Sequence, residues 1–449
     1  MSARGVGRRR PLAVISEAGS AAGADAQRQR TDWFGQPRGL TILFLTEMWE
    51  IFSYYGMRTL LVYYMVKQLL ITQQHASLIY GLYNAFVYFT PIIGGILCDR
   101  WLGRRNSVLL GGSIMALGHF MMAFEPLFYF ALATIGIGNG LFLPSLPSQI
   151  SGLYQPDDPR RRSSYNYYYL GINVGAFLAP LACGTIGELY GWHWGFTVAG
   201  IGMVSGLVIY ILGGRYLPPE PPRTAPVRPA VQQHWYEAGI ARRFALLAGI
   251  CGVVVVFRAA YEQVGNTLPL WIENVDRTAG AFQIPMTWFQ SLNPLLVFLL
   301  TPWFVARWVR HAREGHELSS LRKMAIGAGG VALSYLLLAG VAAFSGSGVV
   351  AEGWIWLVIF FVVMTAGELY ILPIGLGLFG RLAPAGFAAT TIALWFLAAF
   401  FGNLLAGAFG TLWSSLSPPQ FFAATAAIAA LSGALLLAFN RPAQRAEAE

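Results

Sequence analysis

Apolar runs of about 20 residues recur along the whole chain, and they constrain the fold more than any other feature. A helix of that length crosses the ~30 Å hydrocarbon core of a bilayer. Charged residues make up 11% of the 449 residues, against about 25% in ordinary soluble domains. The fold class predicted is an all-α polytopic membrane protein with twelve transmembrane helices, near residues 39–66, 76–98, 107–124, 127–150, 165–187, 195–214, 244–270, 286–306, 322–344, 353–377, 387–411 and 420–439.

The longest polar connection, residues 215–243, divides the chain into two halves. Its prolines exclude a continuous helix and favour an extended linker. We therefore expect an N-terminal six-helix bundle over 37–214 and a C-terminal six-helix bundle over 244–440. Residues 1–36 are expected to be a disordered cytoplasmic tail, and residues 441–449 a second cytoplasmic tail. Two six-helix halves with a binding site between them are common in secondary transporters.

The basic residues predict the orientation. Of the 30 Lys and Arg residues, 26 lie in segments on one side of the predicted helices, and such residues collect in the cytoplasm. Both termini are then cytoplasmic, and we expect a multi-pass protein of a bacterial inner membrane. Topology accounts for the net charge of +9, so we predict no nucleic-acid partner.

Catalytic and metal-binding patterns are absent from the sequence. Cys98, Cys183 and Cys251 lie in or beside predicted spans without a CxxC pair, which predicts neither a disulfide framework nor a metal site. Neither HExxH nor GxSxG occurs. We expect no enzyme and no cofactor, and we interpret His119 as a hydrogen-bonded core residue.

The stretch EMWEIFSYYGMR, residues 47–58, places charge inside an apolar helix. At 100° per residue Glu47, Tyr54 and Arg58 share one face, with Glu50 about 60° to one side. Ionisable groups at membrane depth are costly, and they usually mark substrate or proton pathways. The alternative is that these charges pair only to hold helices together.

Two further acidic residues and two asparagines lie in predicted spans. Glu262 can pair with Arg258 one turn earlier on its own helix. Glu368 has no nearby cation in VVMTAGELYILP, which favours a functional role over a structural one. Asn173 and Asn293 can either bind a ligand or bond between helices.

EMWEIFSYYGMR resembles the first-helix motif E-x-x-E-R-F-x-Y-Y-G-M-R of the proton-dependent oligopeptide transporters of the major facilitator superfamily. Further segments resemble that family in the same order, among them GNGLFLPS (138–145), YYYLGINVGAFLAP (167–180), GWHWGF (191–196), YEQVGN (261–266), WFQSLNP (288–294), GELYILPIGL (367–376) and WFLAAFFGNLLAG (395–407). The resemblance implies the major facilitator fold and proton-coupled transport of di- and tripeptides.

The resemblance also implies roles for particular residues. Proton coupling falls to Glu47, Glu50, Arg58 and Glu262, with Arg58 and Glu262 forming an ion pair between the first and seventh helices. Asn173, Asn293 and Glu368 hold the peptide, and Glu368 faces its amino terminus. Side-chain pockets are lined by Tyr54, Tyr55, Tyr83, Trp395 and Phe396. In GGILCDRWLGRR (94–105) we expect Asp99 to pair with Arg100 and Arg104 as a cytoplasmic gating loop.

The chain departs from the family pattern at basic positions. Ile51 replaces the arginine of E-x-x-E-R-F, and Leu143 replaces the lysine of G-x-G-x-x-K-P. An aliphatic side chain cannot attract a carboxylate. Arg258 is gained where the family has an aromatic residue, and it either pairs with Glu262 or recognises an anion; we include it in the substrate-binding set. Leu372 stands where the family tends to have serine.

We therefore predict a secondary active transporter of di- and tripeptides or peptide-like molecules, working by alternating access with altered carboxylate recognition. Its partners are the ligand, protons and the lipid bilayer, and we expect a monomer. The alternative is a substrate-binding sensor, or an uncoupled facilitator or exporter of a non-peptide amphiphile.

Overall fold

The computed structural model describes residues 35–155, 157–220, 238–345, 352–384 and 387–448. Helix covers most of each of the twelve predicted ranges. The N-terminal half contains α2 (Arg38–Tyr63), α3 (Gln73–Leu97), α4 (Arg104–Met121), α5 (Phe128–Ser145), α6 (Arg160–Ala179), α7 (Thr185–Tyr190) and α8 (Trp192–Leu212). The C-terminal half contains α9 (Ala238–Tyr261), α10 (Gln263–Asn266), α11 (Leu268–Ile272), α12 (Trp288–Arg313), α13 (Ser320–Ser345), α14 (Gly353–Leu369), α15 (Leu372–Leu382), α16 (Ala388–Gly410), α17 (Pro418–Ala438) and α18 (Asn440–Ala448).

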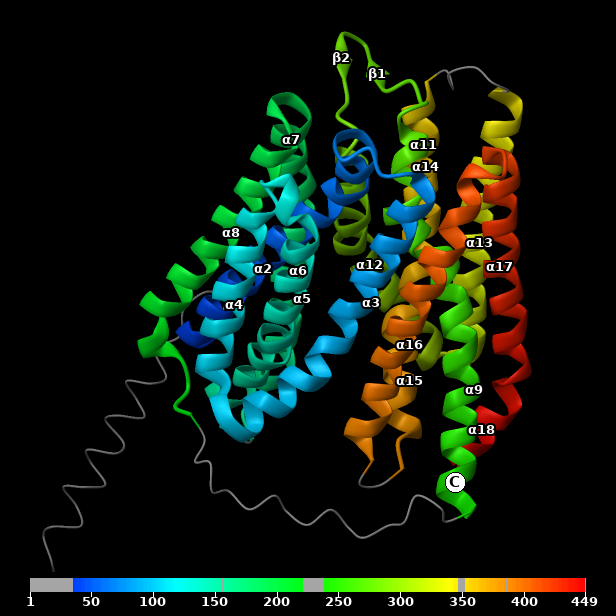
Figure 1. The fold of residues 1–449 in the computed structure, drawn as a ribbon. Coiled ribbons are helices and arrows are strands. Elements are labelled where there is room, and N and C mark those ends of the chain that lie inside the picture. Colours follow the sequence, from blue (N-terminus) through cyan, green and yellow to red (C-terminus); the bar gives the residue numbers. More distant parts are fainter. Residues whose placement is uncertain (1–34, 156, 221–237, 346–351, 385–386, 449) are drawn as a thin grey trace, which may run out of the picture.

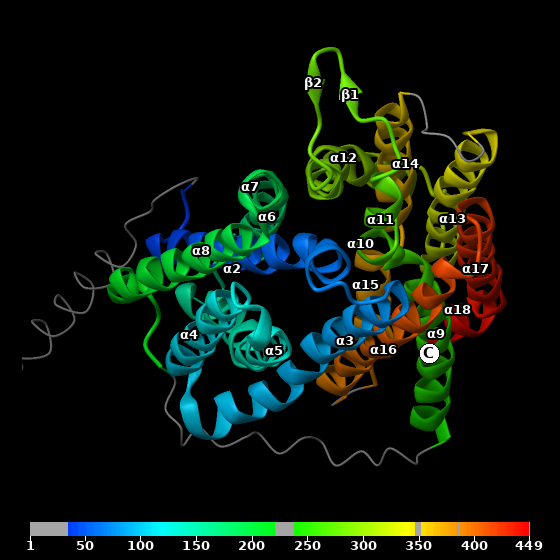
Figure 2. The same cartoon turned by 45° about the horizontal axis from the view of Figure 1, so that its top comes forward.

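The two halves form separate helical bundles, which lie side by side in Figures 1 and 2. Each bundle has its own apolar core. Phe360, Phe361 and Phe421 are fully buried in the C-terminal core, and Phe142 and Phe196 are fully buried in the N-terminal bundle. The short antiparallel hairpin of β1 (Thr278–Ala279) and β2 (Phe282–Gln283) projects at one end, beside α7 and α11.

Ten helical stretches in the described part of the chain are long and apolar enough to cross a membrane. Those that begin at Arg38 (α2) and Arg104 (α4) are not among them, since charged and polar side chains lower their hydropathy. The polytopic all-α prediction is confirmed. Helices cover all twelve predicted spans, but for α2 and α4 the assignment as membrane spans is still a prediction from the sequence.

Three of the long helices are interrupted. α6 passes into α7 through a π-helical turn at 180–184, α9 is followed by α10 and α11, and α14 breaks at Tyr370 before α15. Prolines stand in the first turns of α11 and α15, where a missing backbone N–H costs nothing. Glu262 occupies the break between α9 and α10, and Glu368 lies in the last turn of α14. Discontinuous helices of this kind often form transporter binding sites.

Two segments differ from the predicted boundaries. Helix α9 begins at Ala238, inside the segment predicted as linker, since AGIARR contains good helix formers. The predicted C-terminal tail is helical as α18, where Arg381 Nε contacts Glu447 Oε1 at 3.2 Å. Most of the predicted N-terminal tail, and residues 221–237 of the linker, lie outside the described residues.

Helices approach most closely where glycines replace side chains. A Cβ on Gly94 of α3 would lie 1.9 Å from the carbonyl oxygen of Gly140 on α5. Between the bundles, a Cβ on Gly81 of α3 would lie 2.6 Å from Cα of Gly407 on α16. Small residues of this kind let membrane helices pack backbone to backbone.

The α3–α5 contact predicts that Gly94→Ala is destabilising. Because the new methyl group meets a backbone oxygen, we expect the free energy of unfolding to fall by about 1–3 kcal/mol. Gly340→Ala in α13 is the control, since nothing lies within 4 Å of its Cβ position, and helix propensity there favours Ala by up to about 1 kcal/mol. Thermal unfolding of the purified protein in detergent measures both. Equal stability of the two variants would contradict the close packing.

Candidate functional site

One carboxylate, that of Glu262, lies between two arginines from different bundles. Its Oε2 accepts a hydrogen bond from Nη2 of Arg58 on α2 at 2.7 Å, and its Oε1 accepts one from Nη1 of Arg258 on α9 at 3.0 Å. The side chains of Arg58, Arg258 and Glu262 are 18%, 7% and 4% exposed. We call these three residues the charge triad. With all three ionised, the triad carries one net positive charge.

Tyrosines of α3 surround the triad. The Tyr80 hydroxyl accepts hydrogen bonds from Nη2 and Nε of Arg58 at 2.7 and 3.0 Å. The Arg258 guanidinium lies 5.6 Å from the centre of the Tyr88 ring. Sequence reasoning missed both tyrosines, although Tyr80, Asn84 and Tyr88 follow each other at four-residue spacing on one face of the helix.

The structure shows Arg258 in the ion pair with Glu262, one of the two alternatives left open by the sequence. It does not displace Arg58, because the two arginines bind different oxygens of the carboxylate. Within the described residues, Nε of Arg258 is buried and has no hydrogen-bond acceptor. Anion recognition by Arg258 stays a prediction, and the triad as a whole carries a net positive charge when its three groups are ionised.

Glu368 forms a second, negative centre. Its Oε2 accepts a hydrogen bond from Nδ2 of Asn293 at 2.5 Å, and the same amide lies 3.1 Å from the Thr365 hydroxyl. The tyrosines in electrostatic range of Glu368 come from both bundles, namely Tyr55, Tyr169 and Tyr261. Glu368 therefore lies close to side chains of both bundles.

Glu47 and Glu50 lie on α2, and each is 2% exposed. Neither has an ion pair among the residues that the structure describes, and Oε2 of Glu50 has no hydrogen-bond partner there. Ile51 beside them is buried. Tyr83 is buried and interacts electrostatically with both Glu50 and Arg58, and its hydroxyl has no hydrogen-bond partner among the described residues.

The remaining predicted substrate residues differ in their surroundings. The Tyr54 hydroxyl donates to Oδ1 of Asn84 at 3.1 Å, and Nδ2 of Asn173 donates to the Tyr169 carbonyl of its own helix at 2.9 Å. Trp395 packs edge-on against Phe379 in the C-terminal core.

The prediction that Trp395 lines a side-chain pocket is not supported, since its large ring fills the space above Gly375. Phe396 is 38% exposed.

The expected gating pairs of Asp99 are not formed. In the described part of the chain no ion pair joins Asp99 to Arg100 or Arg104. Asp99 and Arg100 are exposed, and water competes well for such groups. Arg104 instead donates to the Ser148 carbonyl at 3.2 Å, and the Glu220 carboxylate accepts from the backbone N–H groups of Arg104 and Arg105 at the start of α4.

Glu188 is a functional candidate that sequence reasoning missed. From α7 in the N-terminal bundle, its carboxylate accepts hydrogen bonds from Met286 N at 3.0 Å, Thr287 N at 2.8 Å and Thr287 Oγ1 at 2.6 Å. Those groups form the amino end of α12 in the other bundle, where a helix favours negative charge. Capping residues are normally local in sequence, so nothing in the sequence indicates this contact.

Polar contacts between the bundles gather toward the end of the molecule where α7, α11 and the β-hairpin lie (Figure 1). Besides those of the triad and Glu188, they are Thr59–Gln290, Tyr63–Pro269, Lys67–Glu273, Gln73–Gly410, Gln74–Ser414, Thr185–Trp288 and Phe177–Ser291. For the described residues, no hydrogen bond or ion pair joins the bundles at the opposite end. The polar contacts that join the bundles are therefore confined, among the described residues, to one end of the molecule.

His119 does not behave as expected. It is fully buried on α4, but neither ring nitrogen has a hydrogen-bond partner among the described residues. The expected hydrogen bond is therefore not found. No group of histidine, cysteine and acidic side chains in the described part of the chain could hold a metal ion.

Two membrane-embedded helical bundles, joined by a buried charge triad and by further polar contacts toward one end, define a polytopic transporter of the major facilitator class. The POT family profile matches residues 105–248 and 240–423. The chain belongs to the POT family.

Its relatives include proteins of named function. A di-/tripeptide transporter of Lactococcus lactis subsp. cremoris is 32% identical, over 91% of this chain and 96% of that protein. The peptide transporter YePEPT of Yersinia enterocolitica is 32% identical, over 84% of this chain and 88% of that protein. The bacterial relatives and the ten spans indicate a multi-pass protein of the inner membrane.

Solved structures agree with this assignment. A peptide transporter POT variant in complex with alafosfalin superposes with a TM-score of 0.84 at 30% identity, covering 93% of this chain and 97% of that chain. A POT family transporter in complex with 5-aminolevulinic acid gives a TM-score of 0.83 at 25% identity, covering 92% and 98%.

The triad predicts strong coupling between Arg258 and Glu262. Glu262→Gln leaves two buried arginines facing each other, and we expect the free energy of unfolding to fall by about 3–5 kcal/mol. Arg258→Met alone costs less, because Glu262 keeps Arg58. The double variant should be more stable than Glu262→Gln alone, since one uncompensated charge has been removed.

Thermal unfolding in detergent measures the stability of the wild type, the two single variants and the double variant, which together form a double-mutant cycle. Glu317→Gln is the control, because it removes an exposed carboxylate whose partner, Lys323, lies at the surface of the same bundle. Additive effects of Arg258→Met and Glu262→Gln would contradict a shared charge triad.

Proposed function

We propose that the chain is a secondary active transporter of di- and tripeptides or peptide-like molecules, driven by protons. The observation that carries this proposal is the Glu262 carboxylate, which binds one arginine from each bundle. A contact of this kind links the arrangement of the bundles to the charge of a single titratable group. The named functions of the relatives, and peptide-like ligands such as alafosfalin in a solved POT structure, support the substrate class.

The contacts support alternating access. Because Arg58, Lys67 and Glu188 join the bundles at one end only, rocking of one bundle against the other would open that end and close the opposite one. The positive-inside pattern places the termini in the cytoplasm. In that orientation the end that carries the interbundle contacts is extracellular, and we assign an inward-facing state to this arrangement.

The two charged centres suit a dipolar ligand. Glu368 supplies an acceptor for a peptide amino terminus, alongside Asn293. The charge triad has net positive charge and supplies the attraction for a carboxylate that Ile51 and Leu143 cannot provide. This assigns the carboxylate to the triad as a unit rather than to Arg258 alone.

Proton coupling follows from the same carboxylate. A proton on Glu262 removes the negative charge that holds Arg58 and Arg258, so the bridge between the bundles weakens and both guanidinium groups become available to the substrate carboxylate. Loss of the proton restores the bridge. In this scheme Glu47 and Glu50 take part in proton transfer, and Tyr83 is the side chain that interacts electrostatically with both Glu50 and Arg58 of the triad.

A second function, binding or facilitated movement without proton coupling, is favoured by one observation. Glu50 has a buried oxygen with no partner in the described part of the chain, and Ile51 supplies no cation. A carboxylate in such surroundings is costly to ionise and can remain protonated throughout.

Uptake into proteoliposomes tests these functions. We expect a labelled dipeptide to accumulate under an inward proton gradient, and Glu262→Gln to abolish accumulation, whereas Glu317→Gln, the same exchange on an exposed side chain, retains it. Arg258→Trp is expected to weaken uptake of the dipeptide more than uptake of its C-terminally amidated analogue.

Two outcomes would contradict the coupled scheme. If uptake were the same with and without the proton gradient, and the same in wild type and Glu262→Gln, the protein would be an uncoupled facilitator. Dipeptide binding to the purified protein without any flux or exchange would indicate a sensor.

The Glu188 contact predicts a shift between conformations. Glu188→Ala removes an ionised acceptor shared by three donors, and such hydrogen bonds contribute about 1.5–3 kcal/mol. We expect the ratio of closed to open extracellular ends to fall by about tenfold or more.

Spin labels at Tyr190→Cys and Phe282→Cys, both exposed positions near that end, report the change as a longer-distance population. The three native cysteines are buried and are replaced in this background. Glu125→Ala is the control, because Glu125 accepts its hydrogen bond from Gln68 of the same bundle. If the distances between the spin labels were unchanged in Glu188→Ala, the Glu188 contact would not stabilise the closed extracellular end.

A further inference from the structure

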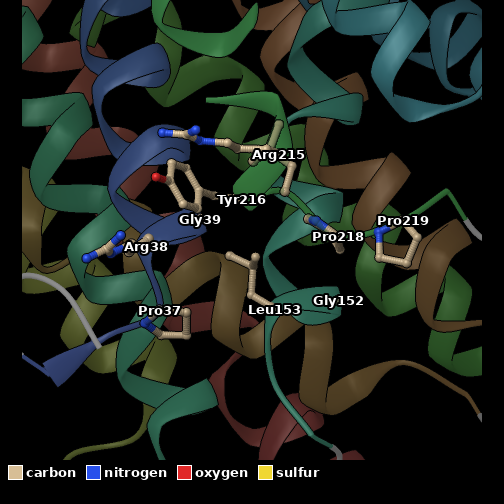
Figure 3. A pocket seen from close by; sticks show the side chains of 10 residues that line it. Pro37, Arg38, Gly39, Gly152, Leu153, Arg215, Tyr216, Pro218 and Pro219 are labelled. Atoms are coloured by element: carbon tan, nitrogen blue, oxygen red, sulfur yellow. The ribbon is translucent and has the colours of Figure 1, made fainter. Parts of the chain in front are cut away.

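A polar cavity of about 390 Å³ lies in the N-terminal bundle, at the end opposite the interbundle contacts (Figure 3). The start of α2, residues 152–153 and residues 215–219 line it. It is separate from the charge triad, and nothing in the proposed transport cycle uses it.

Two arginines define the chemistry of this cavity. The guanidinium carbons of Arg38 and Arg215 lie 5.7 and 4.8 Å from the centre of the same ring, that of Tyr216. Figure 3 shows both guanidinium groups beside that ring. Within the described residues, neither arginine has an ion pair or a hydrogen bond, so two positive charges stand together without a counterion.

The surrounding backbone holds this arrangement in place. A Cβ on Gly39 would lie 2.4 Å from Leu153 Cδ2 and 2.5 Å from the Tyr216 carbonyl, so α2 touches both neighbouring segments directly. A Cβ on Gly152 would lie 2.9 Å from Pro218. The two arginines, 177 positions apart in the sequence, are therefore carried by chain segments that pack without intervening side chains.

A topological role alone would not require this geometry. Arginines that only retain a loop in the cytoplasm can point anywhere into water. Here two of them converge on one aromatic ring, although their like charges repel each other. Stacking on tyrosine orients each planar guanidinium and leaves its N–H groups free for an anion with several oxygens.

We propose that this cavity binds a phosphate group, held by Arg38 and Arg215. Phosphate oxygens match the paired N–H donors of guanidinium groups. Two sources present such a group at this position. One is the head group of an anionic phospholipid in the leaflet at this end, since basic pockets among transmembrane helices bind such head groups. The other is a soluble phosphate.

Two arms of one experiment distinguish these sources. In the first, full-length protein in nanodiscs of phosphatidylcholine with increasing phosphatidylglycerol is released for native mass spectrometry, which counts bound phosphatidylglycerol. In the second, delipidated protein in detergent is titrated with inorganic phosphate while thermal stability is recorded. If the protein retains the lipid but is not stabilised by phosphate, and Arg38→Gln/Arg215→Gln loses the lipid, the cavity is a head-group site. If phosphate stabilises the wild type but not this double variant, the cavity is a site for a soluble anion.

The variants test the geometry. Each basic residue near a membrane surface contributes about fivefold in affinity for an anionic lipid, so Arg38→Gln/Arg215→Gln is expected to lower affinity by about thirtyfold. Tyr216→Leu keeps both charges but removes their common ring, and a loss of about two- to fivefold is expected. Arg38→Lys/Arg215→Lys keeps the charge and guards against misfolding of the glutamine variant; it should bind more weakly than wild type because Lys lacks the planar fork.

Arg310→Gln/Arg313→Gln is the matched control. It removes two exposed arginines at the same end of the molecule, from the last turn of α12, where neither stacks on a common ring. We expect this control to bind as wild type does. Equal losses in both double variants, or no binding of either probe by the wild type, would overturn the proposal.

Discussion

The Glu262 carboxylate is the group on which the arrangement of the molecule depends. It binds an arginine of each bundle, and all three side chains are largely withdrawn from water. A buried charge is tolerated only when its partners are in place, so the position of the bundles and the ionisation of Glu262 are linked. One arginine would be enough to compensate this carboxylate, so the second leaves a surplus positive charge. In the proposed function, the surplus charge attracts the carboxylate of the substrate, and the acidic Glu368 binds its amino terminus.

The surrounding packing makes that linkage possible. Glu262 lies at a break between α9 and α10, and Glu368 lies just before the break at the end of α14, where the backbone is not committed to a continuous helix. Gly81 and Gly407 bring α3 and α16 into backbone contact across the bundle interface. Closure at that end is completed by Glu188, whose carboxylate caps a helix of the opposite bundle.

Much of the site could be predicted from residues whose partners are local or whose cost of burial is high. Arg58, Glu262 and Glu368 are conspicuous because charge in an apolar helix needs a reason. Contacts between distant segments were less predictable. The sequence left two alternatives open for Arg258, which binds Glu262; Trp395 packs in the C-terminal core; and Asp99 forms no ion pair with the gating-loop arginines among the described residues. Tyr88 and Glu188 were missed because their partners lie far away in the sequence.

By itself the sequence determined the membrane-spanning helices, the division into two halves and the family, because hydropathy, the proline-rich linker and ordered motifs are properties of the chain read locally. Only the tertiary structure decided how Glu262 is shared between two arginines, at which end polar contacts join the bundles, and that Arg38 and Arg215 meet at Tyr216. Each of those outcomes depends on distances between helices that are remote in sequence. Such distances follow from the packing of whole helices, which no local pattern records.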